Sequence, residues 1–166
     1  MFSIRSFTLA ALLSAALAAP AVAGPPWISI ELPANPYDRD TRSAFLLVHA
    51  FHHGTAINAI VTGTAEGLVN GERRTIKLEF TSTGRDGVRA LRKMWPDDGV
   101  WTLVITASQE PGDGATAVIV LGADGEVASV KVPTRREGDW TVPAKVSMAD
   151  IESGLRTRAL ALAGKD

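Results

Sequence analysis

The sequence contains no cysteine, so disulfide bonds and thiolate chemistry are excluded as sources of stability or activity. It also lacks a charge excess, because 17 Lys and Arg residues stand against 18 Asp and Glu residues and the formal net charge is −1. Proteins that bind nucleic acid usually carry a marked basic excess, so no nucleic-acid partner is expected. The hydrophobic content of 46% is ordinary for a globular chain, and stability must therefore come from a packed core.

The first residues, 1–23, are predicted to be a cleaved export signal. Arg5 supplies a positive charge, residues 7–19 form an apolar run, and Ala21-Val22-Ala23 is a small-x-small cleavage site before Gly24. The apolar run is too short to span a bilayer, and no later stretch approaches about 18 unbroken apolar residues. We therefore expect residues 24–166 to form a single domain that is periplasmic or secreted, with no membrane insertion after cleavage.

Apolar and polar residues alternate with a period of two over much of the remaining chain, which indicates β-strands. Residues 75–81 alternate cleanly, and Trp101 leads a run rich in β-branched residues that is predicted to face the core. Asn70-Gly71 and Asp124-Gly125 predict tight hairpin turns, because such turns require positive φ angles. Residues 27–32 lie between prolines, which suits a strand at a sheet edge.

The end of the chain, about residues 148–163, is predicted to be a helix. Ser147 fits its N-cap and Asp150 places an acidic residue in the first turn. Apolar residues then recur at helical spacing, at Ile151, Leu155, Ala159 and Leu162. About eight short strands with one terminal helix predict an all-β fold, an immunoglobulin-like antiparallel β-sandwich with a short C-terminal helix.

A series of short motifs runs from Ser43 to Ala107. The motifs are His53-Gly54, Val61-Thr62-Gly63 with Gly67, Ile76-x-Leu78-x-Phe80, Asp86-Gly87-Val88 and Gly99-x-Trp101-x-Leu103-x-Ile105. In this order they resemble the immunoglobulin-like or fibronectin-III-like β-sandwiches of exported bacterial proteins. The resemblance implies that the aromatic residue of the last motif enters the core between the sheets. It implies no residue roles, because that fold serves adhesion, copper handling and accessory functions alike.

All the histidines of the chain lie close together, at His49, His52 and His53. Imidazole suits copper or zinc outside the cytoplasm, so these three residues are a candidate metal site. On a strand, His49 and His53 share a face about 13 Å apart and His52 points the other way, so one ion could not hold two of them. On a helix, His49 would lie over the other two and could share an ion with them.

We favour a strand for the histidine segment, because Phe45, Val48 and Phe51 make it rich in β-formers. Apolar residues on both faces predict a central strand, with the C-terminal helix over its outer face. The preferred interpretation is then that the histidines form hydrogen bonds at a sheet rim, and metal binding is the alternative.

Three tryptophans, Trp27, Trp95 and Trp140, form a possible ligand surface, because they lie at a loop mouth or near predicted strand starts. The sequence has no Gly-x-Ser-x-Gly, Ser-x-x-Lys or His-Glu-x-x-His motif. The leading hypothesis is therefore an exported, non-catalytic binding or accessory protein without a cofactor, whose partner is another envelope or extracellular protein or a small ligand. The alternatives are a periplasmic copper- or zinc-binding protein that uses the histidine segment, and a hydrolase whose catalytic groups form no recognised motif.

Overall fold

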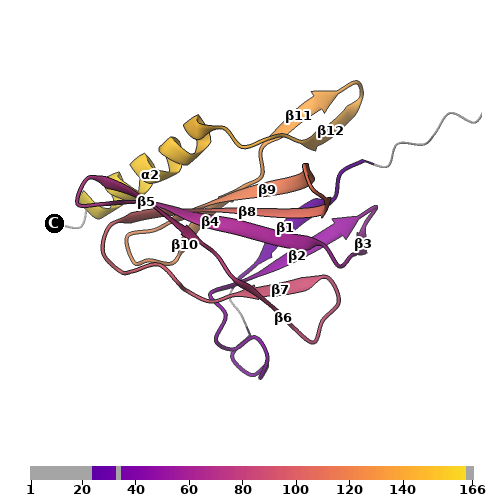
Figure 1. Ribbon diagram of the computed structural model, residues 1–166, viewed down its shortest axis with the longest axis horizontal. Helices are drawn as coiled ribbons and strands as arrows, with labels where there is room; N and C mark the ends of the chain where they lie inside the picture. The colour runs from indigo at the N-terminus through magenta and orange to yellow at the C-terminus, as the bar shows by residue number, and fades with distance from the viewer. Residues whose placement is uncertain (1–23, 33–34, 164–166) are drawn as a thin grey trace, which may run out of the picture.

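The computed structural model describes residues 24–32 and 35–163, and the predicted export signal, residues 1–23, lies outside them. Two antiparallel sheets pack against each other, as Figure 1 shows. The first sheet has the order β1 (Trp27–Glu31), β2 (Leu46–His52), β7 (Val88–Leu91) and β6 (Phe80–Ser82), with β3 (Thr55–Ala56) also paired to β2. The second has the order β10 (Val127–Lys131), β9 (Asp113–Leu121), β8 (Val100–Glu110), β4 (Ile60–Val69) and β5 (Glu72–Lys77).

The strand order is that of an immunoglobulin-like sandwich. The order β1-β2-β7-β6 corresponds to strands A, B, E and D, and β5-β4-β8-β9 corresponds to C′, C, F and G of that fold. Strand β10 continues the second sheet beyond G. The predicted fold class, an all-β sandwich with a short C-terminal helix, is confirmed, and β1 is the expected edge strand.

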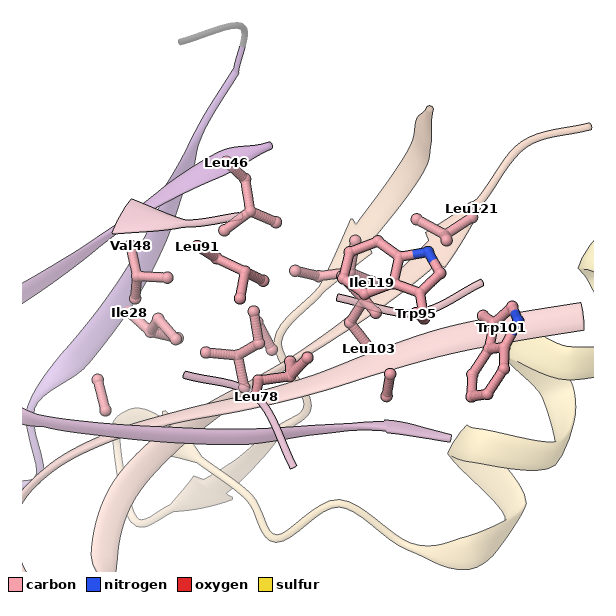
Figure 2. Close-up of a cluster of buried hydrophobic side chains, with 14 of the residues drawn as sticks. Ile28, Leu46, Val48, Leu78, Leu91, Trp95, Trp101, Leu103, Ile119 and Leu121 are labelled. Carbon is pink, nitrogen blue, oxygen red and sulfur yellow. The ribbon is translucent and has the colours of Figure 1, made fainter. Parts of the chain in front are cut away.

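The core lies between the two sheets. Figure 2 shows Leu46 and Leu91 of the first sheet lying with Leu103 and Ile119 of the second in one cluster. Trp101 is 2% exposed, and its indole N–H donates to the carbonyl oxygen of Asp98 at 2.8 Å. The prediction that the aromatic residue of β8 enters the core is therefore confirmed.

The predicted hairpin turns also form. Asn70 and Gly71 join β4 to β5 with φ angles of 52° and 82°, and Asp124-Gly125 lies in the connection from β9 to β10. The single strand predicted over residues 75–81 is wrong, because the chain leaves β5 after Lys77 and enters β6 of the other sheet at Phe80. Between them Leu78 is 3% exposed and donates its N–H to the carbonyl oxygen of Gly63 at 2.9 Å, so it enters the core as the chain changes sheets.

The C-terminal helix, α2 (Met148–Ala163), begins with the predicted cap. The backbone N–H of Asp150 donates to Oγ of Ser147 at 3.3 Å, and the N–H of Ser147 donates to Oδ2 of Asp150 at 3.0 Å. These reciprocal bonds form a capping box with Asp150 in the role that glutamate usually takes. The Ser147 hydroxyl also donates to Oδ2 of Asp150 at 2.7 Å, and this bond, followed by those from the Ser147 backbone N–H and Lys131, lowers the pKa of Asp150 to about 2. No helix of the described segments has the length and apolar character of a membrane span.

One expectation about this helix is wrong. The helix packs on β8 and β9 of the second sheet, not on the outer face of β2 (Figure 1). Its buried face contains Gly154, Leu155 and Arg158, whereas Ala159 is exposed. Glycine is required at 154 because a Cβ there would lie 2.7 Å from Oγ1 of the buried Thr102, so the helix approaches the sheet through this contact.

Candidate functional site

A groove of about 580 Å³ opens at one end of the sandwich. Three segments that are far apart in the sequence meet there: the residues just before β1, the turn between β2 and β3, and the hairpin of β11 (Thr134–Glu137) and β12 (Trp140–Pro143). In Figure 1 this hairpin projects from the body of the sandwich. Most of the lining is apolar, and it includes two histidines and a glutamate; its main residues are Pro25, Trp27, His52, His53, Glu137 and Trp140. We call this site the aromatic groove.

One side of the aromatic groove is fixed by the end of β2. His52 is the last residue of β2 and pairs with Thr55 of β3 across a two-residue turn, His53-Gly54, whose φ angles are 49° and 77°. Nε2 of His52 lies 2.8 Å from the carbonyl oxygen of Gly24. This hydrogen bond ties the segment before β1 to the end of β2.

The other side of the aromatic groove is the β11–β12 hairpin, which Arg135 holds together. One guanidinium N–H donates to the carbonyl oxygen of Pro143 at 2.7 Å, and another donates to Oε2 of Glu137 at 2.9 Å. Glu137 pairs with Trp140 across the hairpin. Trp140 therefore lies on a two-stranded hairpin whose strands are joined by backbone pairing and by the hydrogen bond from Arg135 to Pro143.

The structure brings together two of the three tryptophans of the predicted ligand surface. Trp27 is 40% exposed and Trp140 is 77% exposed, and both line the aromatic groove. Trp95 is elsewhere: it is 4% exposed, belongs to the core cluster, and meets the ring of Phe45 edge-on with centroids 5.0 Å apart. The position of Trp95 directly before Pro96 suggested a residue at a loop mouth, but the structure places its ring inside the core.

The histidine segment is a strand, as predicted, and it divides the histidines. His52 and His53 both line the aromatic groove, with ring centroids 4.3 Å apart. His49 lies on the outer face of the first sheet, where its Nε2 is 2.6 Å from Oε2 of Glu31. In the part of the chain that the structure describes, no three side chains of His, Cys, Asp or Glu are grouped so that they could hold one ion.

Around His49 the charges form a small network on the outer face. Arg85 contacts both oxygens of the Glu31 carboxylate: Nη2 donates to Oε1 at 3.2 Å, and Nη1 lies 3.2 Å from Oε2, the oxygen that His49 also contacts. The Arg85 hydrogen bond, followed by that of His49, holds the pKa of Glu31 below its ordinary value of 4.5. Each member of the network already has a partner, so its simplest role is to fasten β1 and β2 to the loop before β7.

A second, more open depression of about 890 Å³ lies on the second sheet. Hydroxyl groups of Thr62, Thr64 and Thr106 line it, together with Lys77 and the crossing from β5 to β6. Thr62 and Thr106 are direct neighbours across β4 and β8. This depression has no exposed tryptophan, and it is less suited to enclosing a ligand than the aromatic groove.

Sequence reasoning identified four residues of the aromatic groove, the tryptophans at 27 and 140 and the histidines at 52 and 53, but treated them as two unrelated sites. It missed Pro25 and Glu137, for which the sequence carries no signal beyond the nearby turn. Comparison of the chain with protein-family models, with curated proteins and with solved structures finds no match. The site must therefore be interpreted from its own geometry.

Proposed function

We propose that the protein is an exported, non-catalytic binding module, periplasmic or secreted, that holds a small ligand in the aromatic groove. The observation that carries the proposal is the presence of two exposed indoles, Trp27 and Trp140, at one concave site. Indole rings offer large rigid surfaces for the flat or apolar face of a ligand, together with an N–H for one of its polar groups. A volume of about 580 Å³ lies within the range of small-molecule sites.

Binding is favoured over catalysis because two of the polar groups that line the aromatic groove, those of Glu137 and His52, are already engaged. The carboxylate of Glu137 accepts from Arg135, and Nε2 of His52 is hydrogen-bonded to the main chain of Gly24. Because these hydrogen bonds fix the positions of Glu137 and His52, the two side chains are suited to orienting a bound ligand. A small ligand is favoured over a protein partner, because a stable protein interface buries about 800 Å² on each side, far more than one groove of this size.

The proposal is tested with protein that starts at Gly24 and a panel of neutral sugars, aromatic amino acids and nucleosides. Thermal unfolding reports binding, because a ligand at 100 times its Kd stabilises the fold by about 2.7 kcal/mol. At least one compound is expected to raise the Tm of the wild type and to change its tryptophan fluorescence. Trp140→Ala should abolish both effects while folding normally, since this side chain is 77% exposed.

Tyr37→Ala is the matched control, because Tyr37 is another exposed aromatic residue (92%) and does not line the aromatic groove. It should bind like the wild type. If a compound stabilised Trp140→Ala and the wild type equally, the binding site would lie elsewhere. If the whole panel left the Tm unchanged, a small ligand of these classes would be ruled out.

A further inference from the structure

We infer that removal of residues 1–23 completes a binding site for a divalent metal ion, with copper(II) preferred, at one end of the aromatic groove. The ligands are the new α-amino group and the carbonyl oxygen of Gly24 with the imidazoles of His52 and His53. The inference rests on the export step of the proposed function, because the amine exists only if cleavage occurs before Gly24. It does not depend on which small ligand the tryptophans bind.

The first observation is the contact between His52 and Gly24. Nε2 of His52 and the carbonyl oxygen of Gly24 are 2.8 Å apart. Two neighbouring ligands of a tetragonal ion, each bonded at about 2.0 to 2.1 Å and about 90° apart, are separated by about 2.8 to 3.0 Å. The two heavy atoms therefore already have the spacing of adjacent metal ligands, and an ion to one side of the line that joins them can bond to both once the imidazole carries its proton on Nδ1.

The second observation is the sequence Gly24-Pro25-Pro26. The amine and the carbonyl oxygen of one residue close a five-membered ring on a metal ion, so a free Gly24 adds its nitrogen to the oxygen that His52 contacts. Pro25 has no N–H and cannot supply a deprotonated amide to the ion, as the second residue of an ordinary N-terminus can. Coordination positions therefore remain for imidazoles. Pro26 is buried and anchors this short segment against the sandwich.

The third observation is the conformation of His53. It is one of two described non-glycine residues with positive φ, at 49°, and the other is Asn70 at 52°. Both precede a glycine in a two-residue hairpin turn, and the residues preferred there are Asn, Asp and Gly. The turn therefore holds two imidazoles side by side, with the ring centroid of His53 4.3 Å from that of His52.

This site differs from a site made of the three histidines. His49 is on the opposite face of β2, paired with Glu31, and takes no part. The two imidazoles in the aromatic groove are completed by main-chain atoms. Copper(II) is preferred because nitrogen and oxygen ligands in tetragonal geometry suit it, and because it heads the order of divalent affinities.

The test is titration of purified protein with copper(II) sulfate and, separately, zinc sulfate. Protein starting at Gly24 is compared with the same protein acetylated at its α-amino group, which converts the amine into an amide. Copper binding is measured by calorimetry, by the nitrogen hyperfine pattern in electron paramagnetic resonance, and by quenching of fluorescence from Trp27 and Trp140. We expect one copper ion per chain.

Four variants locate the ligands. His52→Ala and His53→Asn should each weaken copper binding by at least about tenfold, the loss that even outer-shell partners of a metal cause. His53→Asn keeps a residue suited to the turn, so a loss of copper affinity in this variant cannot be attributed to misfolding. His49→Ala is the matched histidine control and should bind copper like the wild type. Trp140→Ala should retain copper affinity but show weaker quenching.

Two results would overturn the inference: equal copper affinity with a free and an acetylated α-amino group at Gly24, or retained affinity in the double variant His52→Ala with His53→Asn. N-terminal sequencing of protein recovered from an exporting host tests the cleavage step separately. An exported protein that kept residues before Gly24 would refute the metal site in its natural setting and the predicted cleavage together. An exported protein that began at Gly24 but bound no copper would refute the metal site alone and leave the proposed function standing.

Discussion

Substitution of Gly67 by alanine should destabilise the protein through one residue, Trp101. Gly67 of β4 lies directly opposite Trp101 of β8, and a Cβ at 67 would lie 2.5 Å from Cζ3 of the indole ring. Ordinary carbon contacts are about 3.5 to 4.0 Å, so the ring or the strand must move by about 1 Å. The ring has little freedom, because Trp101 is 2% exposed and its N–H is bonded to Asp98.

The expected cost of Gly67→Ala is that of overpacking a core, about 1 to 3 kcal/mol. For a domain of this length the Tm should fall by roughly 3–10 °C. A double-mutant cycle isolates the cause. In a Trp101→Leu background the six-membered ring is gone, so Gly67→Ala should be neutral or stabilising, since glycine weakens a strand interior.

The four proteins are compared by urea and thermal unfolding followed by circular dichroism. Gly84→Ala serves as the control, because a Cβ there meets only the end of the Asp40 side chain at 3.2 Å, and its effect should stay within about 0.5 kcal/mol. An equal cost of Gly67→Ala in both backgrounds would show that the ring of Trp101 is not what the glycine accommodates.

Three further predictions concern the cap, the outer-face network and the β2–β3 turn. Ser147→Ala should lower the free energy of unfolding in urea by about 1 kcal/mol and return the pKa of Asp150 from about 2 toward 3.8. In the wild type the stabilisation from this carboxylate is complete above pH 3.8 and is lost as pH falls through about 2. Ser153→Ala is the control and should change neither property. Arg85→Ala should raise the pKa of Glu31 toward 4.5, as measured by carbon-13 NMR titration. The wild type should then be stabilised by Arg85 above pH 4.5 and lose this stabilisation as the pH falls, whereas the variant should lack it at every pH. An unchanged titration of Glu31 would contradict the network. His53→Asn should leave the Tm unchanged or raise it, while the reverse substitution Asn70→His in the matching turn should lower it, and a lower Tm for His53→Asn would contradict the turn argument.

Local signals in the sequence were sufficient for most of the fold. Alternation places Trp101 in the core, and Asn70-Gly71 determines a turn, because both depend on a few neighbouring residues. The break after Lys77 was not predictable in this way, since Ile76, Leu78 and Phe80 keep the alternation while the chain changes sheets. A core that lies between two sheets accepts apolar side chains from either side, so the pattern continues across the crossing.

The helix shows where local pattern fails. Helical spacing grouped Ala159 with Ile151, Leu155 and Leu162, but the structure buries Arg158 and exposes Ala159. The contact of Gly154 with Thr102 fixes how the helix is rotated on the sheet, and residues one turn later follow that rotation. Arg158 is 6% exposed, and its Nε and Nη1 are buried without a hydrogen-bond partner among the described residues, a position that hydropathy does not predict for a cationic side chain.

The aromatic groove depends on the register of the edge strand β1, and this is why its parts could be named from the sequence but not assembled. Trp27 pairs with Phe51 and Ile28 with Ala50, which sets the position of Gly24 beside His52. A slip of one residue would shift Gly24 by about 3.3 Å and turn Ile28, now 6% exposed, out of the core. Burial of Ile28 opposes that slip. The 2.8 Å spacing between Gly24 and His52 is thus maintained by the hydrophobic core, several residues away from the atoms that would bind a ligand.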